Sequence, residues 1–249
     1  MDERQTNSLT GEKPDIESST EDYAHRFSGP IGKWFIKVQS DILGNQLSIK
    51  EKGQTIIDFG GGHGQNVHSV LSSGHHLTVL GSTKECSNLI QPHIKNGDID
   101  FLTGSLLSSS LESHQFDICL SFRMLPHLEN WKDHIQELCR VAKTTVIIEF
   151  PNKKSVNVVS GLFFGMKKAI EKNTRPFSLF EIKEVQREFE KRNFQLTEKI
   201  GQYSFPMAFY RILKCPIMAK LIEYPFRILG LSNIYGSPFI CSFEKRSKR

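Results

Sequence analysis

The sequence predicts an α/β fold in which a mostly parallel sheet is covered by helices on both faces. Short apolar, β-branched runs alternate with segments whose apolar residues recur at helical spacing. The first run, residues 55–59, contains Ile56 and Ile57 side by side, as in a strand that is buried on both faces. Four glycines within five residues follow it, and a helical pattern follows them, so strand, tight turn and helix succeed one another.

The elements before and within the sheet can be placed by the same patterns. Residues 1–20 are polar and are expected to be a disordered tail, and residues 21–50 are predicted to be helical. From residue 55 the chain then alternates between predicted strands and predicted helices. Strands are predicted at 55–59, 76–81, 99–103, 115–121 and 144–150, and helices at 64–73, 84–94 and 131–141.

The regular alternation ends at Pro151. Residues 155–171 are interpreted as an inserted helix with an apolar start and a basic end. Ser178 is predicted to begin the next helix, because Ser178 and Glu181 have the spacing of a capping box.

The C-terminal part is predicted to contain the last two strands, at 194–203 and 238–243. Between them, residues 207–229 are aromatic and basic and are interrupted by Pro216 and Pro225. This pattern predicts a helical hairpin between the two strands, broken at the prolines.

Length and composition predict a single domain over residues 21–249. The chain has 249 residues, of which 38% are hydrophobic, so it can bury a full core. Its five cysteines include no C-x-x-C pair, which argues for a reducing compartment and against a zinc site or a disulfide framework. The sequence shows neither a signal peptide nor an apolar run long enough to span a membrane, so a cytoplasmic location is expected.

Charge is distributed unevenly along the chain. Residues 151–249 contain 19 Lys and Arg against 8 Asp and Glu, a net charge of +11. Residues 1–150 contain 13 against 19, a net charge of −6. The basic part suits an acidic substrate, nucleic acid or an anionic membrane surface, although a solvated basic face is an equal alternative.

The spacing of the glycines indicates the ligand. A dinucleotide fingerprint, G-x-G-x-x-G, would need a third glycine at position 65, which is Gln65. The segment from Asp58 to Gly64 instead has the pattern acid-x-G-x-G-x-G. It resembles motif I of the class I methyltransferases that depend on S-adenosylmethionine (SAM).

A second segment resembles the same family. Residues 116–128, FDICLSFRMLPHL, are similar to its pattern of Phe-Asp, a hydrophobic strand, Ser and Leu-x-His-Leu. The resemblance implies a Rossmann-like seven-stranded sheet of order 3-2-1-4-5-7-6, with strand seven antiparallel. It further implies N-terminal helices at 21–50, a SAM-binding core at 51–152 and substrate-side inserts at about 155–176 and 204–237.

The resemblance also implies which residues bind SAM, and it implies no metal. Serines stand at two positions, Ser82 and Ser105, where the family usually has acids that meet the ribose and the adenine. The implied cofactor-binding residues are Asp58, Phe59, Gly60, Gly61, Gly62, Gly64, Ser82, Ser105, Leu106, Ser121 and Phe122.

The methyl acceptor is less closely defined. Transfer from a sulfonium mainly requires alignment, and His127 is the candidate general base if one is used. The aromatic and basic inserts favour a small, hydrophobic or lipid-like acceptor and peripheral contact with a membrane. No N-P-P-Y-type motif follows the fourth strand, so nucleic acid is not favoured. The alternatives are a methyltransferase acting on RNA or protein, and a SAM-fold binding protein without turnover; the oligomeric state is not indicated.

Overall fold

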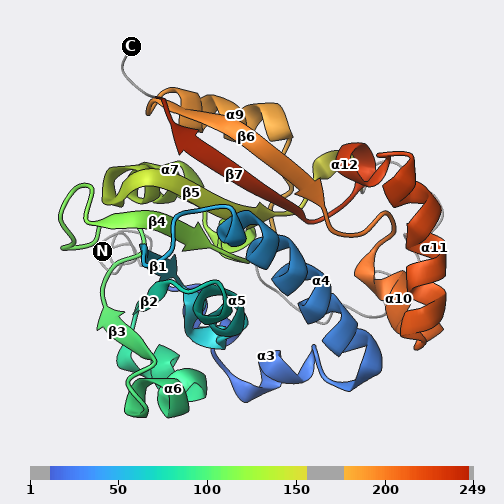
Figure 1. The fold of residues 1–249 in the computed structure, drawn as a ribbon, viewed down its shortest axis with the longest axis horizontal. Coiled ribbons are helices and arrows are strands. Elements are labelled where there is room, and N and C mark those ends of the chain that lie inside the picture. Colours follow the sequence, from blue (N-terminus) through green and yellow to red (C-terminus); the bar gives the residue numbers. More distant parts are fainter. Residues whose placement is uncertain (1–11, 156–176, 247–249) are drawn as a thin grey trace, which may run out of the picture.

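A seven-stranded sheet forms the centre of the molecule, in a computed structural model that describes residues 12–155 and 177–246. Its order is β3-β2-β1-β4-β5-β7-β6 (Figure 1). The first five strands pair in parallel, and β7 runs antiparallel to both β5 and β6. The predicted strand order is therefore confirmed. The strands are β1 (Thr55–Phe59), β2 (His76–Gly81), β3 (Ile99–Thr103), β4 (Phe116–Ser121), β5 (Ala142–Phe150), β6 (Phe194–Gly201) and β7 (Phe239–Lys245).

Helices connect and flank these strands in the described part of the chain (Figure 1). They are α2 (Asp15–Ser18), α3 (Glu21–His25), α4 (Gly29–Ser48), α5 (Val67–Ser72), α6 (Gln91–Lys95), α7 (Trp131–Val141), α9 (Ile182–Glu190), α10 (Met207–Leu213), α11 (Pro216–Ile228) and α12 (Ser232–Tyr235). Short 3₁₀ helices follow three strand ends, namely η1 (Gly61–His63), η2 (Lys84–Ile90) and η3 (Leu125–His127).

Both faces of the sheet are buried. Ile57 packs into one core with residues of α7 and α9, whereas its neighbour Ile56 packs into a second core with residues of α4 and α5. On the first face Phe189 of α9 stacks flat on Phe243 of β7, with ring centroids 3.8 Å apart. Burial on both faces explains why the strands have no alternation of polar and apolar residues.

A third cluster attaches the N-terminal helix to the C-terminal helices. Trp34 and Phe35 of α4 pack against Tyr203, just after β6, and Tyr210 of α10. The Tyr203 hydroxyl also donates a hydrogen bond to the Phe35 carbonyl oxygen at 2.9 Å. This contact fixes the position of α10 and α11 at one end of the sheet.

The predicted capping box at Ser178 is wrong, because α9 begins only at Ile182. The preceding residues continue along the end of β5 instead. The Phe180 amide donates to the Pro151 carbonyl oxygen at 3.1 Å, and the Lys153 amide donates to the Phe180 carbonyl oxygen at 2.9 Å. Backbone pairing with another segment therefore overrides the local helix signal.

Other expectations differ from the structure at the edges of the domain. Disorder was expected through residue 20, but α2 lies within this stretch and its residues Asp15 and Ser18 are buried. The predicted hairpin breaks at Pro216, whereas Pro225 lies inside α11. The predicted helix at 155–171 falls almost entirely outside the described residues.

Replacing Phe35 by alanine should destabilise the fold. The side chain is 1% exposed and contacts both Tyr203 and Tyr210, so its loss leaves a cavity between α4 and α10. The free energy of unfolding, measured by urea titration, should fall by about 3–5 kcal/mol. Ile49→Ala is the control, because Ile49 is 78% exposed and should change stability little. Equal effects of the two changes would contradict the packing described above.

Candidate functional site

The glycine turn lies at the carboxyl end of β1, in the middle of the sheet. Gly60 and Gly64 have φ values of 78° and 74°, a region that side chains other than glycine rarely adopt. A Cβ atom on Gly60 would lie 2.4 Å from the Met124 Sδ, so space as well as conformation requires glycine there. Between these two glycines the chain forms η1, and Val67 then begins α5.

The N-terminal segment, residues 12–20, lies over this turn. The Asp15 carboxylate reaches the end of β2, where its Oδ2 accepts a hydrogen bond from the Ser82 amide at 2.6 Å. The same oxygen accepts from the Cys86 thiol at 3.2 Å. An acid is therefore present at this strand end, although the strand itself ends at Gly81 and is followed by Ser82.

Two further contacts hold residues 12–20 in place. The Glu12 carboxylate accepts hydrogen bonds from the amides of Glu129 and Asn130, at 2.6 and 2.9 Å, just before α7. Ser19 lies so close to the turn that a Cβ atom on Gly62 would be 2.4 Å from its Oγ. The segment thus extends from the start of α7 to the glycine turn.

Asp58 is the buried acid beneath the turn. It is 1% exposed, and its Oδ2 accepts a hydrogen bond from the Asn66 amide group at 2.9 Å. Burial raises the pKa of Asp58 to about 7, although the bond from Asn66 acts in the opposite direction. A carboxyl group with this pKa is partly protonated at neutral pH.

A chain of buried polar side chains leads from Asp58 to the neighbouring strands. The Asn66 Oδ1 accepts from the Gln39 Nε2 at 2.9 Å, and the Gln39 Oε1 accepts from the Arg123 Nη2 at 2.7 Å. The Arg123 Nε lies 3.6 Å from the Glu149 Oε2. The acid of β1 and the carboxylate at the end of β5 are thus connected through side chains.

Arg123 and Glu149 form a buried ion pair at the carboxyl edge of the sheet. The Arg123 guanidinium lies 4.0 Å above the centre of the Phe27 ring, and Gln202 donates a hydrogen bond to the Glu149 Oε1. Burial raises the pKa of Glu149, while the charge of Arg123 partly offsets this increase. Arg123 has a φ of 63°, so its backbone is strained in order to aim the side chain inward.

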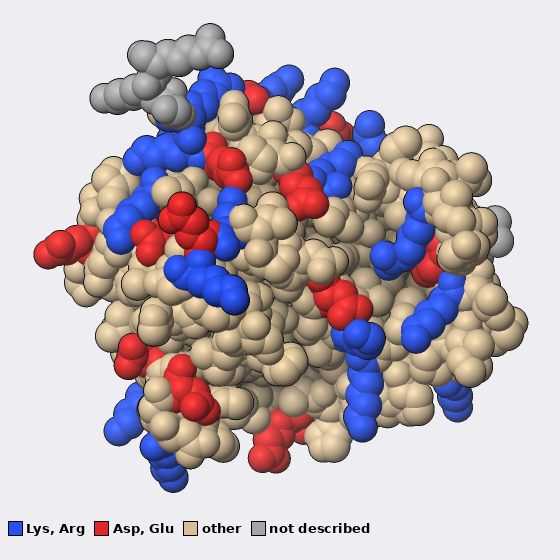
Figure 2. All heavy atoms as spheres, in the orientation of Figure 1, with Lys and Arg blue, Asp and Glu red and all other residues tan. Residues whose placement is uncertain are grey.

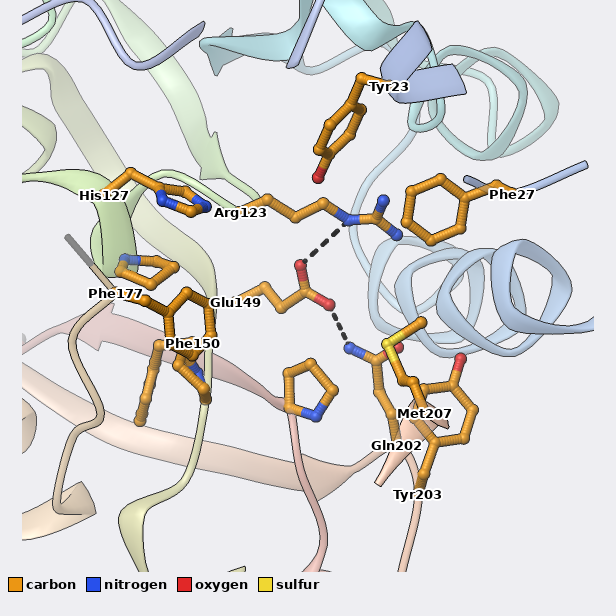
Figure 3. Close-up of a pocket in the computed structure, with 13 residues that line it drawn as sticks. Tyr23, Phe27, Arg123, His127, Glu149, Phe150, Phe177, Gln202, Tyr203 and Met207 are labelled. Atoms are coloured by element: carbon orange, nitrogen blue, oxygen red, sulfur yellow. Dashed lines mark hydrogen bonds and ion pairs between the residues drawn. The ribbon is translucent and has the colours of Figure 1, made fainter. Parts of the chain in front are cut away.

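A cavity of about 160 Å³ lies beside this ion pair (Figure 3). Figure 3 shows the Arg123 guanidinium between Tyr23 and Phe27 on one side and Glu149 on the other. Most of the remaining wall is apolar. It includes His127, Phe150, Phe177, Tyr203 and Met207. The cavity therefore offers an aromatic enclosure with one polar end.

The residues predicted at the ends of β3 and β4 have packing roles in the structure. The His134 Nδ1 lies 2.7 Å from the Leu106 carbonyl oxygen, which can only accept, so this nitrogen carries the proton. Burial lowers the pKa of His134 to about 4, and its neutral Nε2 then accepts from the Ser121 hydroxyl at 2.8 Å. Phe122 and Leu106 are fully buried. The Ser105 hydroxyl oxygen accepts from two amides of its own loop.

Several buried polar atoms around the glycine turn have no hydrogen-bond partner within residues 12–155 and 177–246. They are the Asp15 Oδ1, Ser19 Oγ, Asp58 Oδ1 and His63 Nε2. Buried polar groups are normally paired, so this cluster suits a polar ligand that offers donors to the carboxylates and an acceptor to the His63 Nε2, since the His63 Nδ1 already accepts from the Gln65 amide. Hydroxyl and ammonium groups, such as those of SAM, fit the two carboxylates.

The structure thus brings some predicted site residues together and separates others. Ser82 shares the Asp15 carboxylate with Cys86, whose carbonyl oxygen lies against Gly62 of the turn, whereas His127 lines the aromatic cavity. Sequence reasoning missed Asp15, Gln39 and Gln202. The polarity of the N-terminal segment suggested disorder, and neither glutamine belongs to a local motif.

Comparison with known proteins gives one domain match and a fold. Residues 57–149 match the family described as "Methyltransferase domain". No curated protein sequence matches significantly.

Three solved structures illustrate the similarity in fold. Magnesium protoporphyrin IX methyltransferase of Synechocystis PCC 6803, with bound SAH, aligns at 11% identity over 98% of this chain and 100% of that chain, with a TM-score of 0.62. A SAM-dependent methyltransferase of Aquifex aeolicus aligns at 14% identity over 82% and 88%, with a TM-score of 0.51. The cyclase SpnF aligns at 11% identity over 84% and 80%, with a TM-score of 0.57.

The match at residues 57–149, the sheet order and the glycine turn together show the fold of the class I methyltransferases. None of the helices described here is long and apolar enough to cross a membrane. The described residues also contain no group of three or more His, Cys, Asp or Glu placed to hold a metal ion.

Replacing one partner of the Arg123–Glu149 ion pair should destabilise the protein strongly, and replacing the second partner as well should add little further loss. Glu149→Met leaves Arg123 buried without its carboxylate, and unfolding free energy should fall by about 3–5 kcal/mol. The double variant Arg123→Met with Glu149→Met should lose clearly less than the sum of the two single variants. Urea titration of all three proteins measures this coupling. Additive losses would show that the two side chains do not interact.

Proposed function

We propose that the chain transfers the methyl group of SAM to a small, hydrophobic or lipid-like acceptor held in the cavity beside Arg123 and Glu149. The observation that carries the proposal is the cavity itself. It is aromatic, it lies at the carboxyl edge of β4 and β5, and a chain of hydrogen bonds connects its polar end to Asp58. Ligands of open α/β sheets bind at this edge.

The groups around the glycine turn would hold the cofactor. Asp58 would meet the ammonium group of SAM, and the backbone of Gly60 to Gly62 would approach its methionine part. Asp15 and Ser82 would supply polar groups at the end of β2, where Asp15 already contacts the Ser82 amide. Residues 12–20 lie directly on the turn, so they would have to lift before SAM binds.

The roles of the cavity residues follow from their chemistry. Bound SAM supplies an electrophilic methyl group. The aromatic wall, including Tyr23 and Phe27, would exclude water and align the acceptor, which is most of what the displacement requires. His127 and Glu149 both line the cavity and are the groups that could accept a proton from the acceptor. Arg123 would orient an oxygen atom of the acceptor at the polar end.

We also propose a cytoplasmic location and contact with a membrane through the basic C-terminal third. A lipid-like acceptor resides in a bilayer, and Met207 of α10 forms part of the cavity wall. The helices that follow Met207 therefore lie beside the acceptor site.

A second candidate is a SAM-fold protein that binds its ligand without turnover. The observation that favours it is the cover over the turn, because Gly62 is in contact with Ser19 and Cys86. Ser105 is moreover engaged with its own loop. Such a protein would bind SAM after residues 12–20 move but would release it unchanged.

Transfer from SAM carrying a labelled methyl group tests the proposed function. The purified protein is incubated with labelled SAM and with separate lipid, small-molecule, RNA and protein fractions of a cell extract. Label should enter the lipid fraction or the apolar small-molecule fraction. Asp58→Ala is the control and should abolish both SAM binding and transfer. Label in RNA or protein alone would contradict the acceptor, and SAM binding without transfer would support the second candidate.

The affinity for SAM should depend on pH through Asp58. The pKa of its carboxyl group is about 7 in the free protein, and a bound ammonium group favours the ionised form. Below pH 7 the protein must therefore release a proton on binding, so affinity should increase from pH 5.5 to pH 7 and then level off.

Calorimetry at pH 6 in two buffers of different ionisation enthalpy measures this proton directly. Nearly one proton per bound SAM should be released by the native protein, and close to none by Asp58→Asn. A binding enthalpy that does not depend on the buffer would contradict the assignment of Asp58 to the ammonium group.

A further inference from the structure

A row of exposed apolar side chains lies along α11. Ile217, Leu221, Tyr224 and Ile228 are each between 62% and 69% exposed. Their spacing of four, three and four residues places them on one side of the helix. We call this side, together with Lys220 and Arg227, the α11 outer face. Isolated apolar side chains on a surface are ordinary, but a continuous row of large ones indicates an interaction site.

The opposite side of α11 is fully engaged within the protein. Glu223 is buried and accepts hydrogen bonds from the Ser204 amide at 2.7 Å, from the Ser204 hydroxyl at 3.0 Å and from the Tyr210 hydroxyl. Phe226 packs edge-on against Phe205. The helix is therefore held by its inner side, and the outer face is not needed for folding.

Charge on these helices has a single sign at the surface. Residues 204–237 contain four cations, Arg211, Lys214, Lys220 and Arg227, and the only acid among them is the buried Glu223. Lys220 and Arg227 follow Ile217 and Tyr224 by three residues, so they border the apolar row, although the Arg227 Nη2 also donates to the Gln202 carbonyl oxygen at 2.7 Å. In Figure 2 blue side chains interrupt the tan surface at the side of the molecule formed by α10 and α11.

We propose that the α11 outer face docks on a bilayer containing anionic lipids. Apolar side chains would insert among the acyl chains, and the long stems of Lys220 and Arg227 would place their charges at the level of the headgroups. A second copy of the chain is a poorer occupant, since a twofold contact would bring these cations against each other. Nucleic acid would leave the row of apolar side chains without a partner.

This docking would place the acceptor cavity next to the lipid. Met207 lines the cavity and begins α10, and Tyr210 of the same helix is hydrogen-bonded to Glu223 of α11. The docking helix and a wall of the cavity therefore move together. Delivery of a lipid-like acceptor from the bilayer rests on the proposed function, whereas the docking itself does not.

Flotation of the full-length protein with vesicles tests the proposal. Vesicles of phosphatidylcholine mixed with phosphatidylglycerol should carry the protein upward, and vesicles of phosphatidylcholine alone should carry much less. Lys220→Gln should weaken binding about fivefold, and added salt should weaken binding by the native protein. Leu221→Glu should weaken binding at least roughly tenfold by placing a charge in the apolar row.

Ile49→Glu is the matched control, because Ile49 is an exposed apolar residue on another part of the surface and its replacement should leave flotation unchanged. SAM affinity should be the same in all variants, which verifies that they fold. Absence of flotation with anionic vesicles, or equal loss in Ile49→Glu and Leu221→Glu, would overturn the proposal. Self-association that Leu221→Glu abolishes, without vesicle binding, would overturn it in favour of a second copy. Methyl transfer to acceptors dissolved in detergent is measured separately, so failure of docking is distinguishable from failure of the proposed function.

Discussion

The burial of Arg123 beside Glu149 is the constraint on which the functional edge of the sheet depends. A guanidinium in this position needs partners on several sides, and it has them in Glu149, Gln39 and the ring of Phe27. These partners come from β5, from α4 and from the turn that follows α3. One charge thus fixes the relative positions of elements that are far apart in the sequence.

The same arrangement separates two environments at one edge. Around the glycine turn, carboxylates and hydroxyls face inward, and several of their atoms have no hydrogen-bond partner in the described part of the chain. On the other side of Gln39 and Arg123, the wall of the cavity is aromatic. The polar region suits a charged cofactor and the aromatic region suits an apolar acceptor. In the proposed reaction the methyl group passes from the polar region to the aromatic one, at the place where Gln39 and Arg123 connect them.

The sequence predicts those parts of the structure whose patterns are contained in a few neighbouring residues. The strands and the glycine turn could be predicted, because runs such as Ile56-Ile57 and the spacing after Asp58 are contained in a few residues. The position of α9 could not, because pairing of Phe180 with Pro151 overrides the capping pattern at Ser178. The order of residues 12–20 comes from a few hydrogen bonds to distant backbone amides, which leave no pattern in the sequence.

The N-terminal stretch has a consequence for the order of events during turnover. Its first part, residues 12–20, lies on the glycine turn, and its continuation through Tyr23 and Phe27 forms one side of the aromatic cavity. One continuous stretch of chain therefore covers the glycine turn and also lines the aromatic cavity. In the proposed reaction an acceptor in contact with Tyr23 and Phe27 would hold this stretch in place, and the donor beneath residues 12–20 would then be retained. Such an enzyme would load its donor first and release its spent donor last.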